Sequence, residues 1–340
     1  MSTTMLSVHR IDVRNADERE YRGLHEFQNR LEIERTPEDP PTAYEQRVGW
    51  WRNTPPKFEH YSWVIWDADG SRVIADAGAT IFRSEQNQHV LDFGIGVLPE
   101  CRRRGLARQL LRAVVELAES QQRRLLIAWT VDSVPAGEAF LLRLGAERGL
   151  EQHTNQLAIA DVDTGLLDQW IERAQERAGD FELGFWTGPY PEAELPAIAR
   201  LTDVMNSAPR GSLDVEDHKI TPEMLREWEA TMQQIGDERW SVYARERSSG
   251  ALAGFSEVFW NSHRPTLLWQ AATGVEPGFR NRGLGRWLKA AMLKRVLAER
   301  PGVQYIRTGN ADSNAPMLHI NHALGFKPFQ ANTVWQLDTA

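Results

Sequence analysis

Two short segments rich in arginine and glycine carry the residues best suited to chemistry. The first reads Val97-Leu-Pro-Glu-Cys-Arg-Arg-Arg-Gly-Leu-Ala-Arg108, and the second reads Val275-Glu-Pro-Gly-Phe-Arg-Asn-Arg-Gly-Leu-Gly-Arg286. Each segment follows an apolar stretch typical of a strand and opens an amphipathic helical pattern. The start of a helix presents unpaired N–H groups and partial positive charge, and glycine lets an anion approach the backbone closely. The repeated pattern therefore predicts two anion sites, each suited to a diphosphate.

The residues expected at these sites are the turns themselves, in which arginines add charge and forked donors. They are Arg102, Arg103, Arg104, Gly105, Leu106, Ala107 and Arg108, and then Arg280, Asn281, Arg282, Gly283, Leu284, Gly285 and Arg286. Alternatively, the glycines only permit close packing and the arginines form a solvated run. Two copies in matching strand–turn–helix contexts favour the binding interpretation. The Gly-x-x-x-x-Gly-Lys-(Ser/Thr) loop is absent, which argues against a phosphate-loop enzyme.

The elements around the turns repeat in the same order. Strands are expected over 61–66, 73–82 and 90–97, a helix over 106–120, a strand over 125–130 and a helix over 136–144; the second half repeats them over 240–244, 252–260, 267–275, 284–298, 305–308 and 316–324. The spacing of Gly105 and Gly283 nearly equals that of Gly145 and Gly325. We expect two copies of one α/β domain over 1–160 and 181–340, joined by a connecting helix within 161–180.

Composition narrows the class of protein. The chain has 340 residues, 41% of them hydrophobic, a formal net charge of −8 and one cysteine, Cys101. The negative charge argues against non-specific nucleic-acid binding, and no segment resembles a membrane span or a secretory leader. A lone cysteine excludes an internal disulfide framework and cysteine-rich metal sites. We expect a cytoplasmic protein without a metal, either a monomer or a homodimer.

At the two turns the chain resembles the GNAT superfamily of acetyl-coenzyme A dependent N-acyltransferases, specifically its tandem-domain members. The resemblance covers most of both halves and implies two GNAT folds of class α/β (α+β), each a mixed, mostly antiparallel sheet flanked by helices. It implies that the turns bind the coenzyme A pyrophosphate and that the preceding strands bind the pantetheine arm. The residues this adds are Ile95, Gly96 and Val97, then Thr273, Gly274 and Val275, and Asn314 at the start of the last helix.

Two departures from the family pattern separate the halves. Many members carry a general-acid tyrosine seven residues after that asparagine, and here the position holds Asn321. The first copy has Val134 and Leu141 at the two positions. The second half is therefore expected to be the catalytic one, and the first half to bind coenzyme A without turnover or to be structural. The layout is similar to that of mycothiol synthases, but their glutamate falls near Leu268 or Trp269, so that substrate is not assigned.

Direct attack of a primary amine on a thioester needs a base for the amine, and Glu257 is the first candidate. Gln270 is expected to orient a water, and Asn321 stands where the family has its acid. The alternative for Glu257 is an outward-facing strand position. His319 and His322 are further proton carriers, or surface residues. In the first half Asp92 takes the position that matches Gln270 along the sequence, so it is the base candidate if that half is active, with a helix-cap or strand-edge charge as the alternative. Cys101 and His60 lack the partners of a nucleophilic site.

The predicted function is acetyl-coenzyme A dependent transfer of an acyl group to the amine of a small molecule, with no nucleic-acid or membrane partner. In the family the amine pocket comes from the first two helices of a domain, here about 21–52 and 195–234. Two alternatives stay open: a coenzyme A binding or sensing protein without turnover, and a protein N-acetyltransferase.

Overall fold

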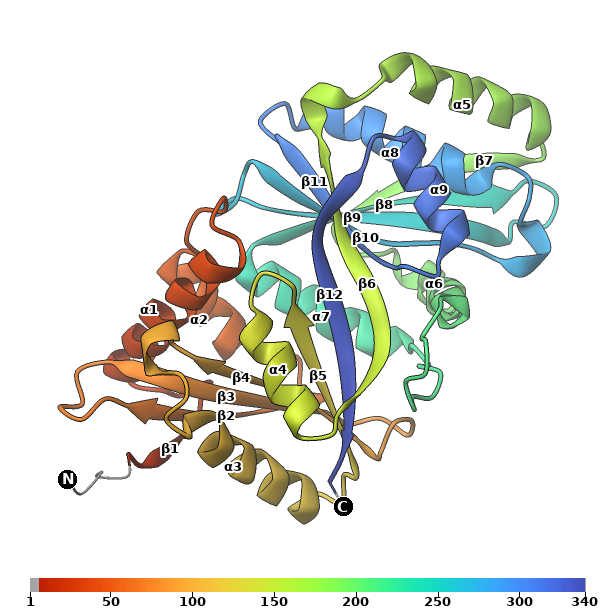
Figure 1. Cartoon of the computed structure of the whole chain (residues 1–340). Coiled ribbons are helices and arrows are strands. Elements are labelled where there is room, and N and C mark those ends of the chain that lie inside the picture. Colours follow the sequence, from red (N-terminus) through yellow and green to blue (C-terminus); the bar gives the residue numbers. More distant parts are fainter. Residues whose placement is uncertain (1–5, 340) are drawn as a thin grey trace. The chain divides into compact units, whose positions relative to one another are not determined.

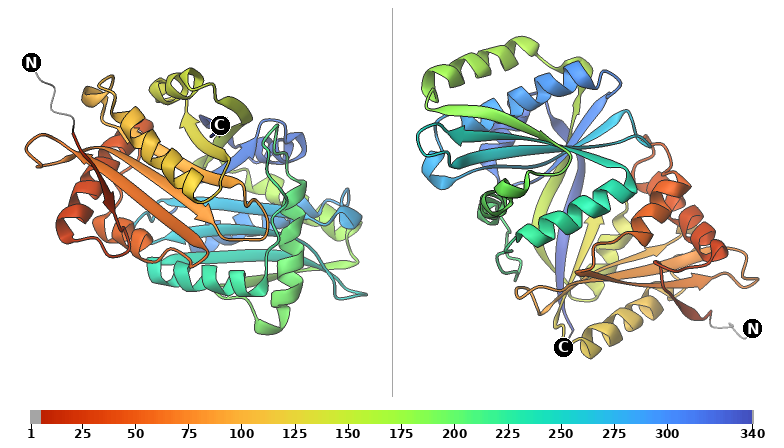
Figure 2. Two further views of the ribbon diagram at one scale, coloured as in Figure 1. Left: turned by 90° about the horizontal axis from the view of Figure 1, so that it is seen from below. Right: turned by 180° about the vertical axis from the view of Figure 1, so that it is seen from behind.

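The computed structural model describes residues 6–339, which form two compact units. Unit 1 contains the chain up to Glu151, the short segment Gly211–Glu216 and the residues from Asn332 onward. Unit 2 contains Gln152–Arg210 and Asp217–Ala331. Figure 1 labels the elements of both units, and Figure 2 gives two further views. Each unit is a mixed, mostly antiparallel sheet flanked by helices, which confirms the predicted fold class.

Unit 1 has the strand order β1-β2-β3-β4-β5-β12. Only β4 and β5 pair in parallel, because α3 connects them as a crossover. The elements are β1 (Val8–Ile11), α1 (Glu18–Arg35), α2 (Tyr44–Arg52), β2 (Phe58–Trp66), β3 (Val73–Phe82), β4 (Val90–Val97), α3 (Leu106–Ser120), β5 (Leu125–Val131), α4 (Pro135–Arg143) and the last residues of β12 (Lys327–Asp338). Helices α1 and α2 lie on one face of this sheet and α3 on the other (Figures 1 and 2).

Unit 2 has the strand order β6-β11-β10-β9-β8-β7, and its one parallel pair is β10 with β11. The elements are β6 (Glu147–Ala158), α5 (Thr164–Arg177), β7 (Phe181–Thr187), α6 (Leu195–Thr202), α7 (Pro222–Ile235), β8 (Asp237–Glu246), β9 (Leu252–Asn261), β10 (Leu267–Val275), α8 (Leu284–Glu299), β11 (Tyr305–Ala311) and α9 (Ala315–Ala323). The buried face predicted for α8 is confirmed by Leu284, Leu288, Met292 and Val296. No helix among the described residues is long and apolar enough to cross a membrane.

Each unit takes one strand from the other half of the sequence. Residues Asn332–Asp338 of β12 pair with β5, and Trp335 lies in the core of unit 1. From Gln152 onward β6 pairs with β11, and Leu157 lies in the core of unit 2. The compact units therefore differ from the boundaries expected at 1–160 and 181–340. The sequence repeat locates similar elements, but strand pairing depends on contacts between residues far apart in the chain.

The segment expected as a connecting helix, 161–180, also belongs to unit 2. Helix α5 buries Leu167, Trp170 and Ala174 in the core that α8 shares. The short segment Gly211–Glu216 completes unit 1 instead: Leu213 packs in a small apolar cluster beside Val90 and Leu125. Neither assignment follows from local pattern, because both rest on distant partners.

Candidate functional site

The two arginine–glycine turns have the same backbone conformation. Gly105 and Gly283 are the N-caps of α3 and α8, with φ values of 83° and 85°. Two residues earlier, Arg103 and Asn281 are also left-handed, with φ values of 66° and 65°. No side chain caps either helix. Successive N–H groups in such a turn form a concave nest for anions, so both turns can hold a diphosphate through the backbone.

Several arginines of the turns are committed to protein partners. The Nε atoms of Arg102 and Arg280 donate to the carbonyls that end the preceding strands, Val97 (3.1 Å) and Val275 (3.0 Å). Arg102 also forms a two-fold bond with Glu34 of α1, at 2.7 and 2.5 Å. These two arginines brace the turns, so the main chain provides the more direct contact with an anion.

The remaining arginines of the turns form two groups, those with a protein partner and those without an ion pair. Arg104 donates to the Glu100 carbonyl, Arg282 pairs with Asp180 at 2.6 Å, and Arg286 contacts His319 at 3.0 Å. Arg103 and Arg108 are exposed, and the structure of residues 6–339 gives them no ion pair. In unit 1 these two side chains are the ones free to reach a phosphate.

In both units the parallel strands part soon after they pair. Strands β4 and β5 pair from Val90 to Asp92, and β10 and β11 pair from Leu267 to Trp269. Beyond these points Ile95–Val97 and Thr273–Val275 have no partner strand on that side within the described chain. Each open edge leads toward its turn, so an amide-bearing arm can pair with the strand and reach the nest with its diphosphate.

Strand β10 contains a bulge that β4 lacks. Its register with β9 shifts between Gln270 and Thr273, so Ala271 and Ala272 have no partner on β9. The register of β4 with β3 is unbroken. A bulge reverses which residues face each side of a sheet, and it often lies next to a binding site.

The bulge corrects the equivalence expected between Asp92 and Gln270. Asp92 pairs with Thr80 and lies on the face that α1 covers. Gln270 pairs with Val258 and lies on the face that α8 covers. By strand pairing, Trp269 is the residue of β10 that corresponds to Asp92 of β4, because each is the last residue paired with the parallel strand; Trp269 lies opposite Phe259. The expectation was wrong because counting from the glycine turn ignores the extra residue in β10.

Glu257 lies on β9 opposite the bulge. Its neighbour Phe255, on the same side of the strand, packs with residues of α6 and α7, so Glu257 belongs to that face. Its side chain is 15% exposed and accepts hydrogen bonds from Tyr190 and from Ser241 Oγ at 3.0 Å. The position is therefore a partly buried polar one, and the alternative of an outward-facing solvated strand position does not hold.

The surroundings of Glu257 hold it in place. Burial and the Glu257 carboxylate keep the pKa of Tyr190 well above its ordinary value, so the phenol stays a donor. Arg239 stacks on the Tyr190 ring with its Cζ 3.5 Å from the centroid, and it also pairs with the buried Glu229 at 2.6 Å. Tyr190 and Arg239 were missed from the sequence, since nothing local connects either residue with Glu257.

Gln270 does not share a face with the Glu257 side chain. Its Nε2 donates to Ser256 Oγ at 3.0 Å and to the Glu257 carbonyl at 2.7 Å. These bonds span the bulge from the α8 side. Gln270 therefore fixes the strand rather than orienting a water beside Glu257.

Both asparagines of the last helix form hydrogen bonds within the protein. Asn314 caps α9 through Met317 N at 3.4 Å. Asn321 is fully buried, and its Nδ2 donates to Asn310 at 2.7 Å, whereas its Oδ1 lacks a partner among the described residues. An amide cannot supply a proton as a tyrosine does. His319 and His322 are exposed, and Cys101 is buried in the core of unit 1.

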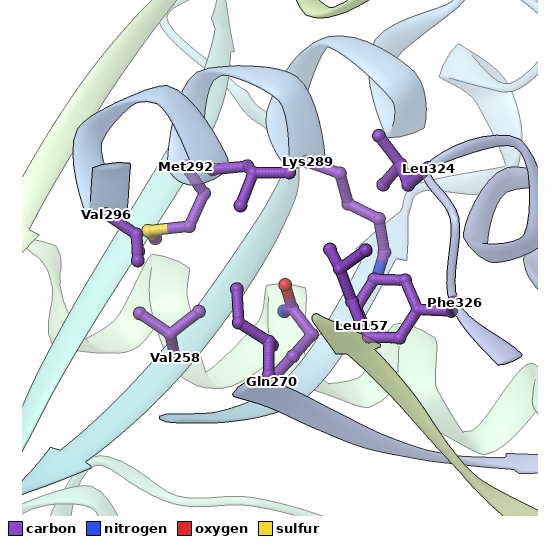
Figure 3. Close-up of a pocket in the computed structure, with 10 residues that line it drawn as sticks. Leu157, Val258, Gln270, Lys289, Met292, Val296, Leu324 and Phe326 are labelled. Atoms are coloured by element: carbon purple, nitrogen blue, oxygen red, sulfur yellow. The ribbon is translucent and has the colours of Figure 1, made fainter. Parts of the chain in front are cut away.

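One further side chain was not found from the sequence. Lys289 of α8 is almost fully buried and lines a pocket with Gln270 and Ile306 beside the point where β10 and β11 part (Figure 3). Its Nζ lies 5.6 Å from the centre of the Phe326 ring. Burial lowers the pKa of Lys289 to about 7. The helical pattern hides this residue because the expected core face was defined from apolar residues alone.

Comparison with known proteins agrees with this geometry. Residues 22–146 match the family model described as "Acetyltransferase (GNAT) family". A tandem GNAT protein from the clavulanic acid biosynthesis pathway is similar over 99% of both chains, with 23% identity and a TM-score of 0.79. A GCN5-related N-acetyltransferase from Sphaerobacter thermophilus is similar over 98% of this chain and 96% of its own, with 13% identity and a TM-score of 0.65.

A third similar structure is the glucosamine N-acetyltransferase region of a fungal multi-domain β-N-acetylglucosaminidase, with 12% identity and a TM-score of 0.68 over 98% of this chain and 38% of that one. No curated protein matches the chain. Residues 22–146 thus match the GNAT acetyltransferase family model, and over its whole length the chain has the fold of a tandem GNAT protein.

Proposed function

We propose that the protein is an acetyl-coenzyme A dependent N-acetyltransferase that acetylates a primary amine of a small molecule, and that unit 2 carries out the transfer. The observation behind this proposal is the position of Glu257. It is a partly buried carboxylate directly opposite the β10 bulge, beside an open strand edge that leads to the nest at Gly283. The candidate base on β9 therefore lies beside the strand, β10, along which the donor's arm would run toward the phosphate site.

Each group in unit 2 has a role in this scheme. When bound, acetyl-coenzyme A supplies the activated acyl group. The Asn281–Gly283 backbone holds the diphosphate, and Thr273–Val275 pair with the amide arm. The N–H groups of the bulge residues Ala271 and Ala272 are candidate donors to the thioester oxygen. Glu257 takes a proton from the amine as the amine attacks, and Tyr190 and Ser241 keep the carboxylate oriented.

Two observations support a small acceptor. One of the similar structures is from the clavulanic acid biosynthesis pathway and another is named as a glucosamine N-acetyltransferase region, so both names contain a small molecule. In this chain a carboxylate with neighbouring aromatic rings, Trp269 and Phe259, lies on the face of α6 and α7. Such a surface suits an ammonium group.

A second candidate function is coenzyme A binding without turnover. It is favoured by Asn321, which replaces the proton donor expected for the leaving thiolate, and by the protein contacts that already engage the Glu257 carboxylate. Acetylation of a protein amine is a third candidate, and an experiment must distinguish it from small-molecule acetylation and from binding without turnover.

The test replaces Glu257 with glutamine and measures thiol release from acetyl-coenzyme A with a panel of small primary amines and with peptides. In a Gly105→Glu background, where the nest of unit 1 is closed, loss of the base should lower kcat/KM for the amine by about 10²–10⁴-fold while acetyl-coenzyme A binding to unit 2 is retained. Glu172→Gln, an exposed carboxylate on α5, is the matched control. Release that is independent of any amine, or an unchanged rate in Glu257→Gln in this background, contradicts the proposal.

A further inference from the structure

Unit 1 has a stretch of sheet surface without side chains. Gly78 on β3 and Gly94 on β4 are direct partners, and both are exposed. A Cβ atom added at either position would meet nothing within 4 Å. The face concerned is that of α1, because a Cβ at Gly96, two residues further along β4, would meet Leu31 and Phe27 of that helix. The paired glycines therefore leave a bare depression next to α1.

A row of three polar residues borders this depression. His60, Thr80 and Asp92 are successive partners across β2, β3 and β4, so their side chains share one face. Thr80 Oγ1 and His60 Nδ1 are hydrogen-bonded at 2.8 Å. The Asp92 carboxylate, in contrast, has no hydrogen bond or ion pair within residues 6–339, and burial raises its pKa to about 6.

The row of polar residues lies where the open edge of β4 begins, the edge along which an acyl donor would bind. Asp92 with Ile127 is the last pair before β4 and β5 part, so the open edge of β4 begins immediately after Asp92. That edge ends at the nest formed by Arg103 and Gly105. An acyl group carried by an arm along this edge would meet the face on which Asp92 lies.

Unit 2 has the same strands, but its carboxylate lies at a different position on them. Glu257 takes the place of Gly78, and the bulge takes the place of Gly94. Trp269 and Phe259 take the places of Asp92 and Thr80. On this face beside the parting strands, unit 2 offers Glu257 from β9 and unit 1 offers Asp92 from β4. A second carboxylate on the same face of unit 1, that of Asp76 on β3, already accepts hydrogen bonds from Gly96 N at 3.2 Å and from Gln28 of α1. Because Glu257 and Asp92 lie on different strands, an alignment of the two glycine turns does not match one carboxylate with the other.

We propose that unit 1 holds a second acceptor site for a small primary amine, with Asp92 as its carboxylate and the Gly78–Gly94 depression as its floor. The proposal takes its acyl donor from the function proposed above. In the step, a bond forms between the amine nitrogen and the acyl carbon as the carbon–sulfur bond breaks. One amine proton passes to the Asp92 carboxylate and coenzyme A leaves as the thiolate. The thiolate takes a proton from solvent to become the thiol, and Asp92 returns its proton to solvent. The GNAT family model matches residues of this unit, which accords with an active role.

The test first closes the nest of unit 2 with Gly283→Glu and then measures amine-dependent thiol release with ethanolamine, glucosamine, spermidine and tyramine. Two further changes are made in this background. Asp92→Asn removes the base, and Gly94→Val fills the depression. Valine suits a strand, the backbone at Gly94 is not left-handed, and the space is open, so this second variant should keep its melting temperature. Glu119→Gln, exposed on α3, is the control.

We expect Gly283→Glu to retain amine-dependent release for at least one of the four amines, and Asp92→Asn and Gly94→Val each to lower it by about tenfold or more. If the wild-type chain releases thiol but Gly283→Glu is silent, the second site is overturned and the function proposed for unit 2 stands. If Gly283→Glu is active and neither variant changes the rate, the second site is again overturned. A wild-type chain that is silent with all four amines contradicts both proposals.

Discussion

Glu257, Asp92 and Lys289 are partly or fully buried ionisable side chains, and each lies beside the point where parallel strands part. Burying a charge is unfavourable unless partners compensate for it. Glu257 has Tyr190, Ser241 and Arg239 around it. Lys289 has only the Phe326 ring among the described residues, so its retention in the core has a measurable effect on stability.

Replacement of Lys289 with methionine should stabilise the protein in a pH-dependent way. Burial lowers the pKa of Lys289 to about 7, so the unfolded chain binds this proton more tightly than the folded chain. The penalty is complete below pH 7 and disappears as the pH rises toward the ordinary lysine value. We expect Lys289→Met to raise the free energy of unfolding by ~3 kcal/mol at pH 6, with the gain shrinking toward pH 10.

Urea unfolding of the wild type and of Lys289→Met across this pH range measures the difference. Lys294→Met, an exposed position on the same helix, should show little pH dependence. An equal gain at pH 6 and pH 10 would show that the Lys289 amine is not buried in the uncharged form.

Among the elements, the turn before α8 and the turn before α3 are the proposed binding sites of the donor. Gly283 and Gly105 are left-handed, and both stand at the N-terminus of an uncapped helix. A glutamate at Gly283 adds backbone strain of ~1–2 kcal/mol and places a negative charge at the nest. Gly278, in the same loop, is exposed, has open space and is not left-handed, so Gly278→Glu is a matched control.

Calorimetric titration with acetyl-coenzyme A tests this element. Gly283→Glu and Gly105→Glu should each remove one binding site, and the double variant should bind none. Gly278→Glu should bind like the wild type, because its carboxylate lies outside the nest. If Gly283→Glu binds acetyl-coenzyme A with unchanged stoichiometry, the turn before α8 does not bind the diphosphate.

The elements also show what the sequence could predict. The turns, α3 and α8 follow from local pattern, and their positions agree with prediction within a few residues. The bulge at Ala271 and Ala272 has no local signature, and it reversed the face expected for Gln270 relative to Asp92. The partners of Arg102 and Glu257, namely Glu34 and Tyr190, lie far away in the chain, so periodicity could not find them.

For the molecule as a whole, the exchanged strands decide what can fold independently. Unit 1 needs Asn332–Asp338 to pair with β5 and Leu213 to cover Val90. Unit 2 needs the later part of β6 to pair with β11. A division at the sequence repeat removes a strand from each unit and leaves an unpaired sheet edge beside a partly open core.

Fragments cut at the expected boundary should therefore fail alone. We expect residues 1–160 and 161–340, expressed separately, to lack cooperative thermal unfolding and to lose near-ultraviolet circular dichroism. Mixed or expressed together, they should restore both signals, because the missing strands are then supplied in trans. Cooperative folding of either fragment by itself would show that the exchanged strand is dispensable.

The most direct test of the account follows an isotope-labelled acetyl group from acetyl-coenzyme A in the full-length chain. Rapid quenching of the reaction with a free primary amine as acceptor should show the label passing to the amine in step with thiol release, with none attached to the protein. In a Gly105→Glu background, where the nest of unit 1 is closed, Glu257→Gln should slow this transfer by about 10²-fold or more. Label that stays on the donor at saturating amine, or that accumulates on the protein, would contradict direct transfer to an amine.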